Sequence, residues 1–233
     1  MRTRTRRLLS AFVVLILTAA AAAYFSRYLP DRWNPWTPLR LDEAPNFLTR
    51  VKLLRLREDS AMCLDVLAQS GIRYAPLPDA VRGPGCGFKN VVMIAGLTAD
   101  VNRPFVLSCP AAVSLALWEQ QVLQPAAEAV FATPVVKIEH FGSYSCRNIY
   151  HRAKGPRSLH ATAEAIDLAT FVFSDGRRIK VAKDWAHDTP ESLFLHELRD
   201  GACPIFSAVL GPDFNAAHRD HFHFDIGPYR ACR

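Results

Sequence analysis

An unbroken apolar run near the amino terminus divides this chain into parts that must fold in different surroundings. Residues 8–25 are all apolar, aromatic or small, and Ser10 and Thr18 are the only aliphatic hydroxyl side chains among them. Residues 1–7 carry four arginines and no acidic residue. A basic flank followed by such a run sends the rest of the chain across a membrane and leaves the arginines inside. We therefore expect everything after residue 25 to fold outside the cytoplasm.

The sequence of this run is compatible with a cleaved signal peptide and with an uncleaved membrane anchor. Residues 19–23 are all alanine and could contain a cleavage site for a signal peptidase. The run is also long enough for a short membrane span, at about 1.5 Å per residue against a hydrocarbon core of about 30 Å. Arg27, Tyr28, Trp33 and Trp36 follow it, and basic and aromatic residues hold spans at the membrane interface. We favour an uncleaved signal anchor, with cleavage and release as the alternative.

The net charge of +6 belongs to the targeting segment rather than to the folded part. The five arginines that flank the apolar run are Arg2, Arg4, Arg6, Arg7 and Arg27. Removing these five of the 28 basic residues leaves 23, against 22 acidic residues. A nucleic-acid-binding protein concentrates positive charge on one face of its folded domain. We therefore expect no nucleic-acid partner.

All six cysteines follow the apolar run. They are Cys63, Cys86, Cys109, Cys146, Cys203 and Cys232. An even number of cysteines in an exported chain predicts disulfide bonds, and six cysteines allow 15 pairings. No two of them form a CxxC pair, so a zinc site built from thiolates is not expected. Free and buried cysteines are the alternative for some of them.

The exported part divides into a stalk and one domain. Residues 26–46 contain four prolines together with tryptophan and charged residues, which predicts a stiff stalk leading away from the membrane. Residues 47–233 follow as a domain with alternating helical and strand patterns. Helices are expected at 47–57, from Asp59 or Ser60 to Gly71, at 110–131 with a kink at Pro125, and from Thr189 to about Asp200. Strands are expected at 72–77, 90–95, 104–107, 135–140, 165–173, 178–181 and 221–226. These elements show no βαβ rhythm, so we expect an α+β fold with a mostly antiparallel sheet flanked by helices.

Two short segments carry residues that suit a catalytic zinc, which needs three nitrogen or oxygen ligands and one open position. His160 and Asp167 in the first are seven residues apart, and such a separation on one strand would put them on opposite faces. The segment is therefore expected to turn, so that both side chains converge. In the second segment, His221 and His223 share one face of a strand. That spacing suits one ligand and one neighbouring catalytic group, although each segment alone could be an ordinary hydrogen-bonded pair.

The same two segments carry a family resemblance. The pattern Ser158-x-His160-x-x-Ala163-x-Ala165-x-Asp167, followed by His221-x-His223, is similar to the zinc signature of the D-Ala-D-Ala metallopeptidases. Further matching stretches are Leu77–Asp79, Gly85–Gly87, Gly142–Arg147, Asp175–Arg177, Arg199–Cys203, Leu210–Pro212, Asn215–His218 and Asp220–His223. With these, residues 45–233 resemble the bacterial extensin-like proteins. The C-terminal domain of those proteins is a divergent relative of the D-Ala-D-Ala metallopeptidases, the lysostaphin-type peptidases and the hedgehog signalling domain.

The resemblance implies a fold like that of this group and a zinc ion held by His160, Asp167 and His223. The fourth position of the ion would hold a water whose pKa falls toward about 7. One departure from the group lies between the first two ligands. The metallopeptidases usually have glycine in the place of Ala163, and an alanine there would be strained if its φ were positive.

The resemblance also implies roles for residues beside the ion. His221 is the first candidate to take the proton of the water or to stabilise the oxyanion, and Asp220 is the second. Asp220 could instead orient His221. The carboxypeptidases of the group have glutamate in the place of Asp220, so the resemblance leaves the choice of general base between the two residues open. Arg147 would bind a substrate carboxylate or the oxyanion, with a structural salt bridge as the alternative. Ser158 is expected to orient the loop of the site by a hydrogen bond, and His218 to lie beside the substrate.

The function implied is a zinc-dependent hydrolase that cleaves stem-peptide or cross-link amide bonds of peptidoglycan, as an endopeptidase or a carboxypeptidase. Its expected location is the bacterial inner membrane, with one span and the domain in the periplasm, or the periplasm alone after cleavage. The alternative is a non-catalytic module that binds the cell wall and keeps its zinc. A fourth protein ligand from His218 or His221 would favour that module, and an open position would favour catalysis.

Overall fold

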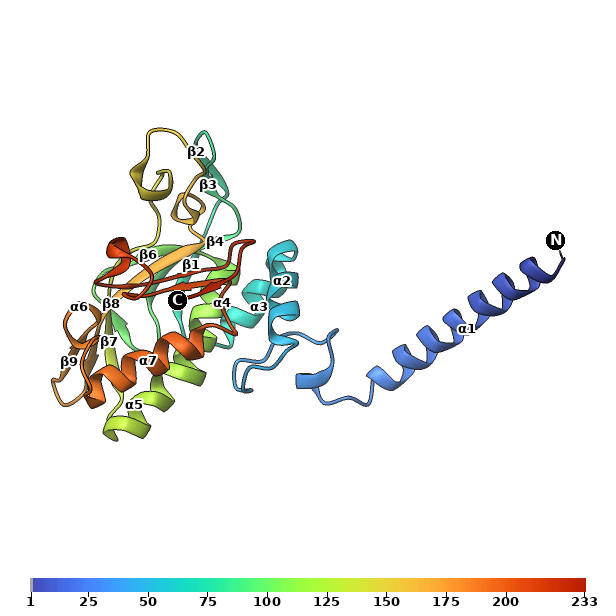
Figure 1. Cartoon of the computed structure of the whole chain (residues 1–233), viewed down its shortest axis with the longest axis horizontal. Helices are drawn as coiled ribbons and strands as arrows, with labels where there is room; N and C mark the ends of the chain where they lie inside the picture. Colours follow the sequence, from blue (N-terminus) through green and yellow to red (C-terminus); the bar gives the residue numbers. More distant parts are fainter. Residues whose placement is uncertain (1) are drawn as a thin grey trace.

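The computed structural model describes residues 2–233 (Figure 1). Helix α1 (Arg2–Ser26) projects from the folded body, and its segment Arg6–Ser26 has a mean hydropathy of 2.3. This segment is long and apolar enough to span a membrane or to act as a signal sequence, and none of it is buried against the body. Its position agrees with the expected apolar segment at residues 8–25.

The body contains helices and strands in mixed order. The α-helices are α2 (Thr49–Glu58), α3 (Ser60–Ala68), α4 (Cys109–Trp118), α5 (Gln124–Phe131), α6 (Val181–Asp184) and α7 (Pro190–Ala202). The short helical turns are η1 (Asp31–Trp33), η2 (Glu119–Leu123), η3 (Ile149–His151), η4 (Leu159–Thr162) and η5 (Ala216–His218). The first six strands are β1 (Arg73–Leu77), β2 (Ala80–Gly83), β3 (Cys86–Phe88), β4 (Val91–Gly96), β5 (Asp100–Val101) and β6 (Phe105–Ser108). The other six are β7 (Val135–Gly142), β8 (Ala165–Phe173), β9 (Arg178–Lys180), β10 (Ala208–Leu210), β11 (Phe222–Asp225) and β12 (Ala231–Cys232).

The strands form one large sheet, one small sheet and a hairpin. The large sheet has the order β12-β10-β11-β8-β7-β5, with β9 also paired to β8. The small sheet has the order β1-β4-β6, and β2 pairs with β3. Among the described residues, only the β5–β7 and β10–β12 pairs are parallel. The expected α+β class with a mostly antiparallel sheet is therefore confirmed.

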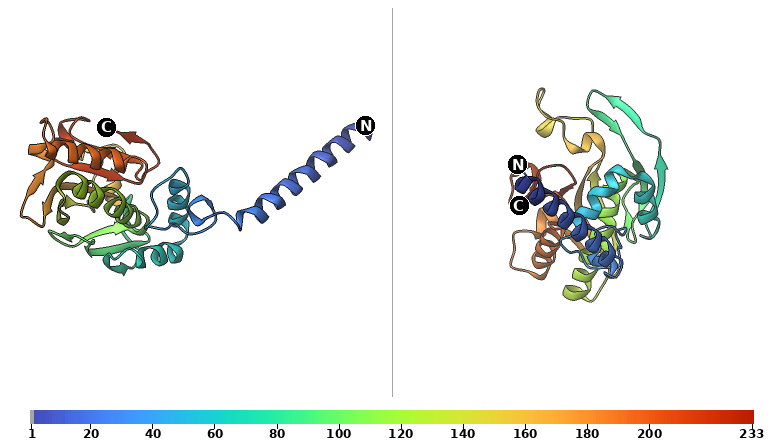
Figure 2. Two further views of the ribbon diagram at one scale, coloured as in Figure 1. Left: turned by 90° about the horizontal axis from the view of Figure 1, so that it is seen from below. Right: turned by 90° about the vertical axis from the view of Figure 1, so that its right-hand side faces the viewer.

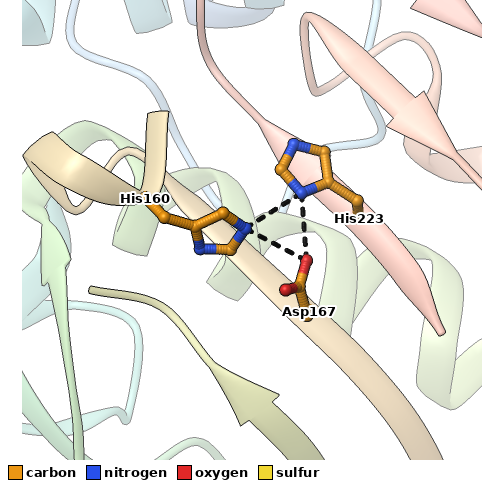
Figure 3. A group of neighbouring side chains, drawn as sticks. All are labelled: His160, Asp167 and His223. Atoms are coloured by element: carbon orange, nitrogen blue, oxygen red, sulfur yellow. Dashed lines mark hydrogen bonds and ion pairs between the residues drawn. The ribbon is translucent and has the colours of Figure 1, made fainter. Parts of the chain in front are cut away.

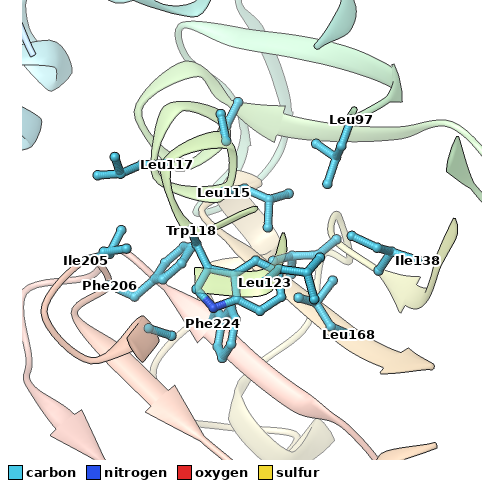
Figure 4. Packing of buried hydrophobic residues seen from close by; sticks show 14 of the residues in the cluster. Leu97, Leu115, Leu117, Trp118, Leu123, Ile138, Leu168, Ile205, Phe206 and Phe224 are labelled. Atoms are coloured by element: carbon cyan, nitrogen blue, oxygen red, sulfur yellow. The ribbon is translucent and has the colours of Figure 1, made fainter. Parts of the chain in front are cut away.

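Helix α4 occupies the centre of the body. All ten of its residues are buried, which agrees with a sequence that is apolar around the whole helix. On one side α4 contacts β4 and β6 of the small sheet. On the other side the ring of Trp118 packs against Phe171 of β8, with ring centres 6.2 Å apart. It also packs against Phe224 of β11, with ring centres 5.3 Å apart (Figure 4). The left view of Figure 2 shows α4 and α5 in the middle of the body.

The helix expected at residues 110–131 is interrupted one turn before its proline. The π-helical turn η2 separates α4 from α5, and Pro125 lies in the first turn of α5. Proline has no N–H to donate and its ring displaces the carbonyl four residues earlier, so the irregularity falls in the preceding turn.

Glu119 in η2 is fully buried and accepts hydrogen bonds from the backbone N–H groups of Thr98 and Ala99.

The segment 26–46 does not form the expected free stalk. The side chains of Leu39 and Leu41 are buried in the main hydrophobic core. The buried ammonium group of Lys52 on α2 donates a hydrogen bond of 2.6 Å to the carbonyl oxygen of Asp31. The segment is therefore folded against α2, and its proline- and tryptophan-rich composition reflects an irregular but packed path.

The six cysteines form three disulfide bonds, as expected for an exported chain. The pairs are Cys63–Cys109, Cys86–Cys146 and Cys203–Cys232. The first joins α3 to α4, and the third joins the end of α7 to β12. The second joins β3 to the segment that precedes η4. This second bond fixes the hairpin β2–β3 beside the loop that carries His160.

Candidate metal centre

Three side chains from separate elements converge on one point, as Figure 3 shows. His160 lies on η4, Asp167 on β8 and His223 on β11. Strands β8 and β11 are antiparallel neighbours, and their register places His223 directly opposite Asp167. Because directly opposed residues project from the same face of a sheet, the two side chains meet above it. The structure thus brings together the three residues that the sequence singled out as ligands.

The three donor atoms form a nearly equilateral triangle. Nε2 of His160 lies 3.1 Å from Nδ1 of His223 and 3.2 Å from Oδ1 of Asp167, and the third side is 3.0 Å. Ligand atoms at about 2.0–2.1 Å from a tetrahedral zinc ion are roughly 3.3 Å apart. The triangle therefore has the size of one face of a zinc tetrahedron. Within residues 2–233, this is the one group of at least three potential ligands whose donor atoms lie this close together.

His160 is held by its own loop. Its backbone N–H donates to the hydroxyl of Ser158, which caps η4, and its carbonyl oxygen accepts from the N–H of Ser145. Its ring Nδ1 donates to the carbonyl oxygen of Ser143. A proton on Nδ1 leaves Nε2 with a free lone pair in the neutral ring, which is the form that binds a metal. Ser158 therefore has the orienting contact that was expected of it, whereas the carbonyl of Ser143 has no side-chain signal in the sequence.

The turn between His160 and Asp167 depends on Ala163. This residue ends η4 with φ +56° and ψ 32°, in the left-handed region. An alanine in this conformation carries the steric strain that glycine would avoid. Its carbonyl oxygen accepts a hydrogen bond from the N–H of Ser108, which holds the turn in place. The strain considered from the sequence is therefore present.

His223 lies between two carboxylates. Its Nδ1 contacts Asp167, and its Nε2 donates to Oδ2 of Asp225 at 3.2 Å. Burial alone would lower the pKa of His223, but the hydrogen bonds with Asp167 and Asp225 outweigh burial and raise that pKa to about 9. Sequence reasoning missed Asp225. Its signal was the two-residue alternation His221, His223, Asp225 along one strand, which places all three on the same face.

Asp167 remains ionised in this setting. Burial would raise the pKa of its carboxyl, but the hydrogen bonds from His160 and His223 hold that pKa well below its usual range. A carboxylate that is negative at all physiological pH values, next to two imidazole nitrogens, is a suitable donor set for zinc. The residues present therefore fit the ion that the sequence predicts.

His221 borders the triangle without belonging to it. Its Nε2 lies 3.6 Å from Oδ1 of Asp167, and its Nδ1 donates to Oδ1 of Asp220 at 2.9 Å. Asp220 therefore faces His221 and orients its ring, which is the second of the two roles considered for it. The ring of His218 lies beside those of His221 and His223, and its Nδ1 is hydrogen-bonded to Oδ1 of Asn215. Burial, followed by the nearby charges of His223 and His221, lowers the pKa of His218 to about 4.

Arg147 belongs to the segment that runs beside the loop of His160. Its carbonyl oxygen accepts from the N–H of Ser158, two residues before His160. Across residues 2–233, the structure has no salt bridge to the Arg147 guanidinium, so the structural ion pair considered for it is not formed. The charge of this side chain is therefore available to a ligand.

A cavity of about 710 Å³ lies next to the same loop. Its walls include the hairpin β2–β3, the start of α4 and the two residues that flank Ala163, Thr162 and Glu164. The metal triad does not line it. The carboxylate of Glu164 is paired there with the guanidinium of Arg57, which also donates to the carbonyl of Ile226. One turn of chain thus forms a wall of the cavity and also carries His160, the first candidate metal ligand.

Comparison with known proteins identifies the domain that holds this site. The family described as extensin-like protein C-terminus matches residues 61–233, well over half of the chain and including the whole triad. No curated protein and no solved structure matches the chain. The matched segment begins in α3 and includes both sheets, all three disulfide bonds and the complete candidate metal centre. The chain therefore belongs to the extensin-like family.

Proposed function

We propose that this domain is a zinc-dependent hydrolase that cleaves amide bonds in the stem peptides or cross-links of peptidoglycan. The observation that carries the proposal is the triangle of His160, Asp167 and His223, whose sides of 3.0–3.2 Å match one face of a zinc tetrahedron. The similarity of its sequence pattern to the D-Ala-D-Ala metallopeptidases supports the same reading. Zinc bound there would act as a Lewis acid and lower the pKa of a coordinated water.

His221 and Asp220, beside the triangle, are suited to proton transfer. His221 presents Nε2 to the site, and its Nδ1 proton is engaged by Asp220, so the neutral ring can accept a proton at Nε2. Asp220 keeps the ring in this tautomer and would stabilise it after protonation. In this proposal His221 is the proton acceptor, and Asp220 is the carboxylate that orients it.

The charge of Arg147 and the cavity beside the turn of His160 support this substrate class. A stem peptide ends in a carboxylate, and the guanidinium of Arg147 has no ionic partner among the described residues. The 710 Å³ cavity beside Thr162 and Glu164 offers room for the rest of a peptide. The anchor-like helix α1 and the three disulfide bonds support a location in the periplasm, at the inner membrane.

A closed metal site with four protein ligands would favour a non-catalytic module that binds the cell wall. Within residues 2–233, the close group of donor atoms contains three side chains, and neither His218 nor His221 belongs to it. An open fourth position favours catalysis over a structural role. The experiment below separates the two functions.

The test uses the purified full chain, its zinc content and purified muropeptides with and without a chelator. The unchanged chain should bind one zinc ion and cleave muropeptides until the chelator is added. His223→Ala should lose both zinc and cleavage. His221→Ala should keep its zinc but cleave about 10²–10⁴ times more slowly. The exposed His187→Ala is the matched control and should behave like the unchanged chain.

Two results would contradict the proposal. Cleavage that survives in His223→Ala and is still stopped by the chelator would mean that the ligands have been assigned wrongly. Bound zinc without cleavage of any muropeptide would show a binding module instead of a hydrolase.

A further inference from the structure

Exposed apolar side chains gather where the chain leaves α1. They are Tyr28, Leu29, Trp33, Trp36, Phe47, Val51 and Leu54, and together they are called the collar face here. Among the residues of this face from Trp33 onward, Phe47 and Trp36 have the largest exposed fractions, 75% and 68%. Large apolar groups this exposed, and this close together, mark an interaction surface when they form a contiguous patch.

The collar face is contiguous in space. The rings of Trp33 and Phe47 are in contact, with centres 5.8 Å apart. Val51 and Leu54 are three residues apart on α2, which places them on one side of this helix, and Phe47 lies in the turn just before it. Arg55, next to Leu54, donates to the carbonyl oxygen of Trp36 and so brings this residue against the same helix.

The backbone beneath the collar face is fixed at both ends. The side-chain amide of Asn34 donates to the carbonyl of Ser26, the last residue of α1, at 2.8 Å. The side-chain amide of Asn46 donates to the carbonyl of Arg32, also at 2.8 Å. The buried ammonium of Lys52 adds its contact to Asp31. These contacts hold the segment that follows α1 close to the domain and leave it no room to extend as a stalk.

We propose that the collar face rests on the lipid surface, so that the domain lies against the membrane from which α1 emerges. The proposal requires that α1 stays attached as an anchor, and it is independent of the hydrolase activity. Three observations select lipid as the occupant. The patch continues directly from the apolar segment Arg6–Ser26. It carries tyrosine and tryptophan, which favour the membrane interface. The exposed guanidinium groups of Arg27 and Arg32 border it and suit anionic headgroups.

The distribution of tryptophan in this chain provides a direct test. Two of the four tryptophans, Trp33 and Trp36, belong to the collar face, whereas Trp118 and Trp185 are buried in the domain. The full chain is inserted into vesicles of phosphatidylglycerol and phosphatidylcholine, whose phosphatidylcholine chains carry bromine near the headgroup. Bromine quenches only tryptophan that lies within the interface. The expected result is loss of the emission of two of the four tryptophans, relative to vesicles without bromine.

Variants assign the quenching to the collar face. Trp33→Phe and Trp36→Phe should each remove part of the quenched emission. Val51→Glu combined with Leu54→Glu should restore the emission of Trp36, because charges on α2 would lift this face from the lipid. Val136→Glu, on the exposed side of β7, is the matched control and should leave the quenching unchanged. All of these positions are exposed, so the variants should fold.

Three outcomes would overturn the proposal. Equal emission in brominated and plain vesicles, with the chain floating together with the vesicles, would mean that the domain stands away from the membrane. A chain that does not float with the vesicles would have no retained anchor. A Leu54→Cys variant that forms a disulfide-linked dimer, while Trp36 remains unquenched, would show that a second copy of the chain covers this face.

Discussion

The carboxylate of Asp225 influences the metal centre through a side chain that it orients. Its Oδ2 accepts from Nε2 of His223, and its Oδ1 accepts from the backbone N–H of Gly227. Both oxygens are therefore occupied by donors. This arrangement aims Nδ1 of His223 at Asp167 and increases the basicity of the ring, as carboxylate partners of metal-binding histidines do.

Replacing Asp225 with asparagine should weaken zinc binding without unfolding the domain. An amide has the same shape but only one acceptor atom for the two donors, His223 and Gly227. We expect zinc affinity to fall about 10–100-fold, measured by competition with a chelator of known affinity. Asp188→Asn changes an exposed carboxylate and serves as the control. Equal affinities for the two variants would show that Asp225 does not orient the ligand.

The pKa of His223 predicts how zinc binding depends on pH. In the metal-free protein that pKa is raised to about 9, so the ring is protonated at neutral pH. A metal binds the neutral ring, and binding must therefore release this proton. Zinc affinity should rise about tenfold for each pH unit from neutral pH to about 9, and level off above it. Affinities measured across this range check the slope, and a flat profile would contradict it.

At the scale of single residues, the sequence contained enough to predict the triad but not its supports. His160, Asp167 and His223 were recognisable because two strand and loop patterns each carried a potential ligand pair. Asp225 was missed although its alternation with His223 was visible. The hydrogen bond from His160 to the carbonyl of Ser143 could not be predicted. A contact made by a backbone carbonyl depends on the fold and not on the side chain of the residue that supplies it.

Among the secondary-structure elements, two alanines end helices in the same unfavourable conformation. Ala132 follows α5 with φ +48°, and Ala163 follows η4 with φ +56°. Ala132 is exposed, whereas Ala163 is fully buried. The left-handed region costs an L-residue roughly 1–2 kcal/mol, and glycine avoids this cost.

Ala132→Gly should therefore stabilise the protein by about 1 kcal/mol, since nothing is lost at an exposed methyl group. Ala163→Gly should gain less, because its buried methyl contributes about 0.8 kcal/mol that the glycine gives up. Urea denaturation of both variants beside the unchanged chain measures the difference. A larger gain at Ala163 than at Ala132 would contradict this account.

The elements themselves were predictable where their patterns were long. Helix α7 begins at its expected cap, Thr189, whose hydroxyl accepts from the N–H of Ser192, and the hairpin β8–β9 lies where its turn residues placed it. The strands of two to four residues, β2, β3, β5, β10 and β12, were missed, because so short a segment has no periodicity to detect. The stalk was predicted wrongly at 26–46, since composition alone does not separate a free irregular segment from a packed one.

For the molecule as a whole, one disulfide bond couples the hairpin β2–β3 to the metal centre. The Cys86–Cys146 bond closes a span of 60 residues and joins β3 to the chain ahead of η4, and β3 also packs against η4. Cys203–Cys232 closes a span of 29 residues and lies on other elements. The two bonds thus differ in whether they support the loop of His160.

Replacing Cys86 and Cys146 with alanine should lower the free energy of unfolding by about 2–4 kcal/mol and also weaken zinc binding. The matched pair Cys203→Ala and Cys232→Ala should lose stability of a similar order but keep its zinc affinity. Denaturation curves and chelator competition on both double variants test this. If both pairs left zinc affinity unchanged, the hairpin would have no part in positioning His160.

A metal ion bound by the triad would also affect the stability and lifetime of this domain. An ion shared by His160 and His223 would bind residues 63 positions apart, and it could do so only after β8 and β11 had paired in the correct register. Such an ion favours the native chain over the unfolded one, by about 2.7 kcal/mol when its free concentration is 100 times the dissociation constant. Scarcity of the ion would then shorten the lifetime of the protein, because each zinc-free copy would open more often to the proteases around it.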